Sequence, residues 1–349
     1  MFAEYQRLQL ELERQPVDFL SRHRRYPGLI DAAKAELAAY VGADTRNVVF
    51  ATNATEGVNA VARSLPLGEG DEVLAPVGEY GAVDMLWRYV CARAGARYVT
   101  REIAPGTGVE DALELLWSGV TEATRAVVCS HVSCFTGVIF PVEELCRRAR
   151  ERGILTMVDG AHALAQVPLD LEELGADFYA GTCHKWLCAP KGAGFLHARP
   201  ERQDLLEPLV VSWDWEEEAE FDSRRRWVGT RDPAAWLSVP AAIRFQAEHG
   251  WDDVRLRCHA LAVEVRRRLA ELFDLEPVAP SESSFAQLVA ARVPACDVFE
   301  VQRRLYDEHR IEVVLLELCG VPLIRVSLQA YNDEEDIETL VRALTEIFR

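Results

Sequence analysis

Short apolar runs alternate with amphipathic stretches along the chain up to about residue 230. The apolar runs are rich in β-branched residues and end in turn residues, which predicts buried strands. The stretches between them repeat apolar residues at helical spacing. We therefore expect an α/β fold, with a mainly parallel central sheet flanked by helices. The expected strands are 47–52, 71–76, 96–103, 125–132, 154–162, 177–183 and 192–199, and the expected helices are 55–65, 80–94 and 142–153.

The pattern changes after that point. Two long helical stretches are expected at 233–250 and 251–272, and a compact set of shorter elements follows them. This set predicts a smaller C-terminal α+β domain. Its expected elements are strands at 284–293, 311–317 and 322–328 and helices at 296–309 and 333–348. The expected division is an N-terminal helical segment (1–27), a large domain (28–232), and a linking helix with the small domain (233–349).

Composition narrows the possible functions. The chain has 349 residues and a formal net charge of −18, which argues against binding to nucleic acid or to an anionic membrane surface. The N-terminus lacks the apolar core of a signal peptide, and no window is apolar enough to span a bilayer. The nine cysteines form no C-x-x-C pair and no cluster at zinc spacing. We expect a cytoplasmic protein without a metal site.

Lys185 is the most unusual candidate for chemistry. It lies between His184 and Trp186 in a run that is otherwise small or apolar. Lysine is seldom placed away from water unless it is paired or reactive. Desolvation lowers the pKa of a lysine and allows it to form a Schiff base. The alternative is an ordinary surface lysine after a strand, which is the commoner case when the residue is taken alone.

Two further signals fall at the ends of expected strands. ATNATEGVN (51–59) leads from a strand into a helix, whose free N–H groups and the Thr55 hydroxyl form a potential phosphate site. The alternative is an ordinary helix cap by Thr55. In VDGAH (158–162), Asp159 follows a buried strand and needs a cationic partner, such as a protonated ring nitrogen. The alternative is an aspartate that caps its own turn.

The three signals together predict one cofactor. They occur in the order phosphate site, carboxylate and lysine, each at a strand end, where open α/β sheets bind ligands. Pyridoxal 5′-phosphate carries a phosphate, a ring nitrogen and an aldehyde at its periphery. We therefore expect this cofactor.

From about residue 28 to its end, the chain resembles the fold-type I pyridoxal-phosphate enzymes of the class V aminotransferase family. Within that family it is most similar to the branch of isopenicillin N epimerase and the cysteine-conjugate C–S lyases. The resemblance implies that residues 28–232 form the cofactor-binding domain. It rests on ATNATEGVN, DGAH, CHKW (183–186), GTRDPAAW (229–236) and IRVSLQAYND (324–333).

The resemblance also implies roles for individual residues. Lys185 would hold the cofactor and carry the proton at Cα of the substrate. Asp159 would pair with the ring nitrogen, and His162 would lie beside the 3-oxygen. Thr230 would reach the phosphate of a neighbouring subunit, which implies a homodimer. The phosphate ligands within one chain would be Ala54, Thr55, Thr182 and His184.

Other implied contacts surround the substrate. Arg325 would bind the α-carboxylate of an amino acid through a two-pronged contact. Tyr80 would stack on the pyridine ring, although a core tyrosine at a helix start is an alternative. Cys134 stands where the family often has an asparagine near the cofactor oxygen, and Ser133 beside it would contact the cofactor. Cys319 is interpreted as structural, because the glycine-rich loop around the desulfurase cysteine is absent.

The motifs do not decide the reaction. We expect β-elimination from an S-substituted cysteine or its sulfoxide, because a lyase needs only one base, Lys185. An epimerase, with Tyr80 as the second acid, is the alternative, followed by transamination or by decarboxylating or oxidative deamination of a cysteine conjugate. A non-catalytic scaffold with this fold is a further alternative.

Epimerase-like chains begin with a glycine-bearing segment that helps to close the pocket. We expect that segment to be missing here or replaced by another element.

Overall fold

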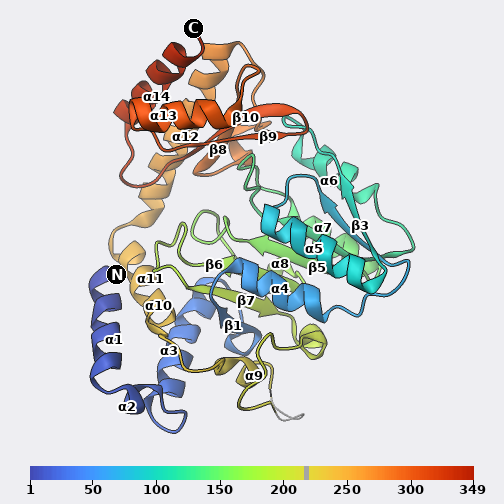
Figure 1. Ribbon diagram of the computed structural model, residues 1–349, viewed down its shortest axis with the longest axis vertical. Helices are drawn as coiled ribbons and strands as arrows, with labels where there is room; N and C mark the ends of the chain where they lie inside the picture. Colours follow the sequence, from blue (N-terminus) through green and yellow to red (C-terminus); the bar gives the residue numbers. More distant parts are fainter. Residues whose placement is uncertain (216–219) are drawn as a thin grey trace.

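The predicted α/β architecture is confirmed in the computed structural model, which describes residues 1–215 and 220–349 (Figure 1). Its central sheet has seven strands in the order β1-β7-β6-β5-β4-β2-β3. All neighbours pair in parallel except β7, which is antiparallel to both β1 and β6. The strands are β1 (Val48–Ala51), β2 (Glu72–Pro76), β3 (Arg97–Arg101), β4 (Thr124–Ser130), β5 (Leu155–Gly160), β6 (Phe178–Thr182) and β7 (Gly194–Ala198).

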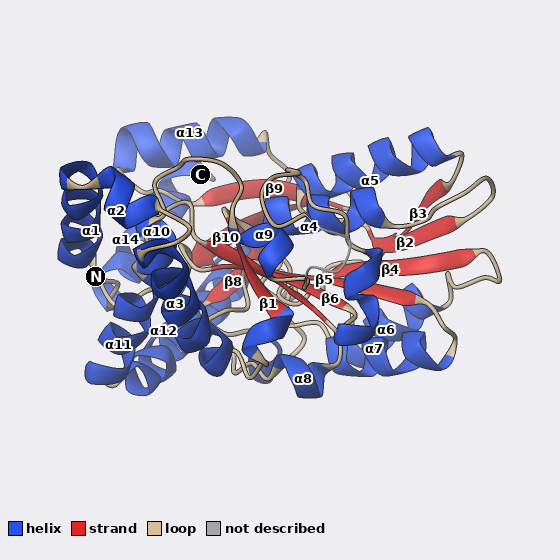
Figure 2. Cartoon of the chain, turned by 90° about the horizontal axis from the view of Figure 1, so that it is seen from below, coloured by secondary structure: helices blue, strands red, loops and turns tan. Residues whose placement is uncertain are grey.

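Helices cover both faces of this sheet, as Figure 2 shows. Alternate residues of β4 serve the two faces: Ala126 and Val128 are buried with α4 and α5, whereas Val127 and Cys129 are buried with the opposite helices. This double burial explains why the strands read as continuous apolar runs. The helices of the first face are α4 (Ala54–Ser64) and α5 (Gly81–Ala94), and those of the second are α3 (Arg25–Tyr40), α6 (Val109–Trp117), α7 (Val142–Glu151) and α8 (Leu171–Leu174).

The expected helix at 233–250 is interrupted. It consists of α10 (Ala234–Leu237) and α11 (Val239–Glu248), because Pro240 lies in the first turn of α11 and has no N–H for a continuous helix. Both pack on α3, which begins before residue 28 and continues past it. The remaining elements of this part are α1 (Phe2–Arg14), α2 (Pro16–Leu20), η1 (Thr45–Asn47), η2 (Pro200–Leu205) and α9 (Ser223–Arg226).

The smaller C-terminal domain is also confirmed. It lies at the top of Figure 1, above the main sheet. Its three strands pair antiparallel in the order β8-β10-β9 and share one apolar core with the helices beside them. No helix of residues 1–215 and 220–349 is long and apolar enough to cross a membrane. The elements are α12 (Trp251–Phe273), η3 (Glu282–Ser284), β8 (Leu288–Arg292), α13 (Val298–His309), β9 (Val314–Leu318), β10 (Val321–Ser327) and α14 (Glu334–Ile347).

Candidate active site

The carboxyl ends of the parallel strands surround a cavity of about 180 Å³. Ligands bind at this edge of open α/β sheets because loops from several strands converge there. Most of the residues predicted from the sequence are brought together at its wall. The lining residues are Asn53, Ala54, Thr55, Tyr80, Ser130, Val132, Cys134, Asp159, Ala161, His162, Thr182, His184 and Lys185.

The start of α4 forms one wall of the cavity. Asn53 caps this helix by accepting a hydrogen bond from the Glu56 N–H at 2.9 Å, so the alternative that Thr55 is the cap is wrong. The Thr55 hydroxyl has no hydrogen bond within the described ranges and is available to a ligand. The hydroxyl of Thr182, at the end of β6, accepts from Ala54 N at 3.0 Å. This wall offers N–H groups and hydroxyls, as a phosphate requires.

The carboxylate of Asp159 lies at the end of β5. One oxygen accepts from Ala161 N at 2.9 Å, so the residue does cap its own turn. It is nevertheless buried, and it has no ion pair within 4.0 Å in the described part of the chain. Burial raises the pKa of this carboxyl. A buried carboxylate in a cavity wall is well suited to a cationic ligand.

Lys185 reaches into the same cavity, so it is not an ordinary surface lysine. Its Nζ lies 2.9 Å from Nε2 of His162, and the indole N–H of Trp186 lies 3.3 Å from the other ring nitrogen of His162. The side chain is exposed to the solvent in the cavity, and the residues around it desolvate the amine only in part. This partial desolvation lowers the pKa of Lys185, and the carboxylate of Asp159 opposes the effect.

Two further cavity residues present polar groups. Tyr80 lies at the N-cap of α5 and is 51% exposed, so the alternative of a core tyrosine is wrong. His184 contacts the carbonyl of Ala193 through Nδ1 at 3.2 Å. A carbonyl only accepts, so Nδ1 carries the proton and Nε2 is left for a ligand.

Arg325 lies on β10 of the small domain, next to the cavity but outside its lining. Its Nη1 donates to the carbonyl of Cys134, whose own side chain lines the cavity. Nε is buried without a hydrogen-bond partner, and Arg325 has no ion pair among the described residues. Burial lowers the pKa of this guanidinium. A half-buried cation without an ion pair among the described residues, beside the cavity, favours an anionic ligand.

Ser133 and Thr230 do not line the cavity. The Ser133 hydroxyl accepts from the N–H groups of Phe135 and Thr136, at 3.3 and 3.2 Å, which turns it into its own loop. The neighbouring Ser130 and Cys134 take its place in the wall. Ser133 therefore does not line this cavity, and its contact with the cofactor stays a prediction. Thr230 is exposed in the loop before α10.

Ser130, Asn53 and Trp186 were not predicted as site residues from the sequence. Ser130 is the last residue of β4 and pairs in register with Asp159, so its position at a strand end was the available signal.

Cys319 forms the turn between β9 and β10, with Sγ 3.9 Å from the carbonyl of Ile103. It does not line the cavity, in keeping with its structural interpretation.

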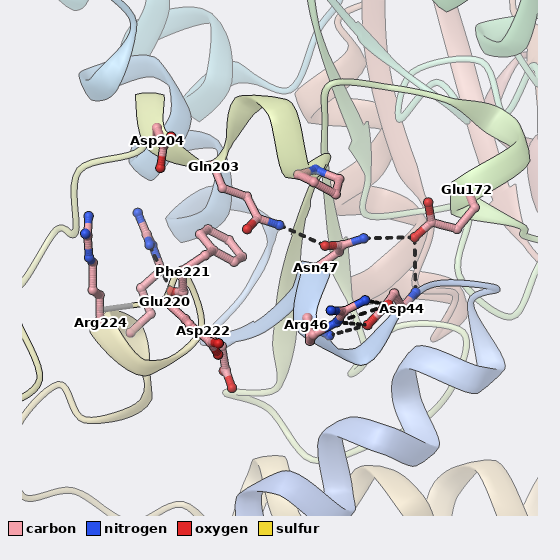
Figure 3. Close-up of a pocket in the computed structure, with 12 residues that line it drawn as sticks. Asp44, Arg46, Asn47, Glu172, Gln203, Asp204, Glu220, Phe221, Asp222 and Arg224 are labelled. Atoms are coloured by element: carbon pink, nitrogen blue, oxygen red, sulfur yellow. Dashed lines mark hydrogen bonds and ion pairs between the residues drawn. The ribbon is translucent and has the colours of Figure 1, made fainter. Parts of the chain in front are cut away.

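A larger cavity, of about 630 Å³, is present elsewhere (Figure 3). It lies beside η1, which precedes β1, and therefore at the opposite edge of the sheet. Several of its polar groups bind one another: Gln203 donates to Asn47, Asn47 donates to Glu172, and Arg46 pairs with Asp44. It contains none of the predicted site residues. Cavity volume therefore does not identify the reactive site. Asp159 and Arg325, which have no ion pair among the described residues, do identify it.

The residues of the smaller cavity fit pyridoxal phosphate. The start of α4 would hold the phosphate, Asp159 the ring nitrogen and Lys185 the aldehyde carbon. The fit rests on three observations: a helix start facing the cavity, a buried carboxylate without an ion pair in the described ranges, and an amine of lowered pKa.

A family model for "Aminotransferase class-V" matches residues 18–340. The chain belongs to this family. It is thus a pyridoxal-phosphate-dependent enzyme of class V, as the sequence predicted. An isopenicillin N epimerase of Amycolatopsis lactamdurans is 38% identical over 351 residues, which cover 95% of this chain and 88% of the relative. A cysteine desulfurase of Haloferax volcanii is 28% identical over 335 residues, which cover 89% and 77%.

Solved structures in the family's fold agree with the architecture. The cystine C–S lyase C-DES, in a complex with cysteine persulfide, superposes with a TM-score of 0.84 and 23% identity, covering 99% of this chain and 93% of that one. At this identity the likeness establishes the fold alone.

We expect Asp159→Asn to stabilise the cofactor-free protein. The folded-state pKa of this carboxyl lies above its unfolded value, so folding favours the protonated form. The stability that this group contributes is present below the unfolded pKa and is lost as the pH rises through the folded pKa. At neutral pH the variant should therefore unfold about 2 °C higher, and the difference should shrink in acid. Its affinity for pyridoxal phosphate should fall at least about tenfold. Thermal unfolding with and without the cofactor checks both.

Asp177→Asn is the matched control. Asp177 is equally buried, but it accepts from Thr156 N at 3.0 Å and pairs with Arg202 at 2.9 Å. Its replacement should lower the unfolding temperature and leave the affinity for the cofactor unchanged. Stabilisation by both variants, or by neither, would contradict the account of Asp159.

Proposed function

We propose that the protein is a C–S lyase that removes the sulfur substituent from an S-substituted L-cysteine or its sulfoxide by β-elimination. The observation that carries this proposal is the single amine of the described cavity wall, Lys185, which lies within 2.9 Å of His162 and beside the helix start. One base that both accepts and returns a proton is sufficient for elimination. The similarity to cysteine desulfurases, which also act on a sulfur amino acid, supports this choice.

The residues of the site have separate roles in this reaction. When bound, pyridoxal phosphate supplies an electron sink that acidifies the Cα–H bond of the amino acid. Arg325 binds the α-carboxylate and thereby fixes which bond faces Lys185. Lys185 accepts the Cα proton, and Asp159 holds the proton on the ring nitrogen. The electron pair of the Cα–H bond forms the Cα–Cβ double bond, the Cβ–S bond breaks, and its pair leaves with sulfur, which takes the proton back from Lys185. One water then yields pyruvate and ammonia from the remaining fragment.

Epimerisation of an amino acid is the second candidate. It is favoured by the 38% identity to an isopenicillin N epimerase and by the position of Tyr80 in the cavity wall. An epimerase needs a second acid opposite Lys185. The exposed hydroxyl of Tyr80 and the protonated thiol of Cys134, whose pKa burial raises to about 12, are the available groups.

Products formed in heavy water distinguish the two reactions. We expect S-alkyl and S-aryl cysteines and their sulfoxides to give pyruvate, ammonia and a free sulfur fragment, identified by mass spectrometry. Ordinary L-amino acids serve as the control and should give no pyruvate. Intact amino acid with deuterium at Cα and mixed stereochemistry would contradict the lyase and support the epimerase. A keto acid formed with the cofactor converted to its amine would instead indicate transamination.

We further propose a cytoplasmic homodimer in which Thr230 reaches the phosphate site of the neighbouring subunit. Thr230 is exposed and lies outside the cavity of its own chain, which suits a residue that acts across an interface. Sedimentation of the purified protein tests this proposal, and a monomer that retains full activity would exclude it.

A further inference from the structure

The hydrogen bonds of His162 define its protonation state. An indole N–H is a donor only, so the contact of Trp186 Nε1 with His162 Nδ1 at 3.3 Å requires a lone pair on Nδ1. A neutral imidazole carries one proton, which must then lie on Nε2. Burial holds the pKa of His162 well below its ordinary value, and the positive charge of Arg325 adds to this effect. The cation is therefore excluded at neutral pH.

The proton on Nε2 has a consequence for Lys185. Nε2 lies 2.9 Å from Lys185 Nζ, and a donor at that distance requires an acceptor. An ammonium group has three donors and no lone pair, whereas a neutral amine has one lone pair. The contact is therefore favourable only when the lysine is neutral.

We propose that Trp186 is a positioning residue, which fixes the tautomer of His162 so that its Nε2–H keeps Lys185 as a neutral, proton-accepting amine. This deepens the role of Lys185 in the proposed function and rests on it for its catalytic meaning. The hydrogen-bond arrangement itself exists without substrate.

Trp186 is held by elements outside the site. Its ring is buried, and its carbonyl accepts from the Gln246 side chain of α11 at 3.0 Å. Gln246 is itself buried and accepts from the Tyr40 hydroxyl of α3 at 3.3 Å. The indole also meets the His162 ring edge-on, at 6.4 Å between centroids. Helices of the scaffold thus determine the position of the indole N–H.

The other charged and titratable groups around this pair are Asp159 of β5, Cys134 after β4, Arg325 of β10, Tyr80 at the start of α5 and His184 beside Lys185. The carboxylate of Asp159 favours the charged lysine and Arg325 opposes it, whereas Cys134 is a protonated thiol. None of these groups is hydrogen-bonded to Trp186 in the described part of the chain. Removing the indole N–H should therefore change the contribution of His162 and leave the other contributions in place.

The tautomer is measured by NMR of protein labelled with ¹⁵N at its eight histidines, in which His162→Asn identifies the signals of His162. In the wild type we expect the proton on Nε2 and a bare Nδ1. In Trp186→Phe the proton should also populate Nδ1. Nε2 then accepts from the ammonium form, and the pKa of Lys185 should rise by about one unit, a tenfold change in its deprotonation equilibrium.

The pKa of Lys185 is obtained from the pH dependence of its acetylation in the cofactor-free full chain, read by mass spectrometry. The assignment is direct because the sequence has three lysines, of which Lys34 is buried against Asp222 and Lys191 serves as an exposed reference. Trp236→Phe is the matched control. It removes a buried indole N–H that donates to the carbonyl of Ala51 at 2.9 Å and should change neither readout.

A wild-type spectrum with the proton on Nδ1 would overturn the inference, even if the Trp186→Phe protein failed to fold. An unchanged pKa of Lys185 in a folded Trp186→Phe protein would also overturn it. Neither readout involves turnover. Failure of the lyase assay with the expected spectrum would therefore reject the proposed function and leave the role of Trp186 intact.

Discussion

Lys185→Ala should lower turnover at least about a thousandfold, because it removes the group that accepts and returns the Cα proton. Borohydride should fix pyridoxal phosphate to the wild-type protein at the peptide that contains Lys185, and to no peptide of the variant. Added methylamine, which supplies a small neutral base, should restore part of the activity. Peptide mass mapping and steady-state rates provide the measurements.

The same variant should be at least as stable as the wild type in the cofactor-free state. The folded-state pKa of Lys185 lies below its unfolded value, so folding disfavours the charged lysine. Lys191→Ala, a change at the exposed lysine of the same loop, is the control and should keep full activity. Substantial turnover by Lys185→Ala would reject the proton-transfer role and support a non-catalytic function for the fold.

The sequence was most informative where one physical rule determines the outcome. Strands buried on both faces appear as uninterrupted apolar runs, and each run that was expected in the large domain is a strand of the central sheet. The interruption of the 233–250 helix was missed because Ser238 and Pro240 also occur inside longer helices. The small helices α6 and α8 were also missed, because they have only nine and four residues and such short segments give a weak helix signal.

The site was predictable as far as backbone position determines it. Residues at strand ends, such as Asp159 and Thr182, converge because parallel strands end at one edge. Side-chain direction inside a loop is not encoded by spacing, which is why Ser133 was expected at a wall that Ser130 and Cys134 form instead. The contact between Trp186 and His162 joins two loops, so only the folded chain reveals it.

Arg325→Gln should raise the KM for an amino-acid substrate about a hundredfold, because two charge-assisted hydrogen bonds to the α-carboxylate are lost. Glutamine can still donate to the carbonyl of Cys134, which Arg325 holds in the wild type. The free protein should therefore lose no stability, since the change removes a half-buried cation without an ion pair among the described residues. Arg325→Lys should be intermediate, because an ammonium group keeps the charge but cannot form the fork.

A substrate that lacks the α-carboxylate distinguishes loss of carboxylate binding from a general disturbance of the structure. The wild type should prefer an S-substituted cysteine to the matching S-substituted cysteamine, and Arg325→Gln should lose this preference. Arg292→Gln is the matched control: Arg292 lies on the neighbouring strand β8, donates to the carbonyl of Pro105 at 2.6 Å and also has a buried Nε without a partner. Its replacement should leave the preference intact. If both variants lost it equally, the cause would be disturbance of the small sheet. If neither did, the α-carboxylate would have to bind elsewhere in the cavity.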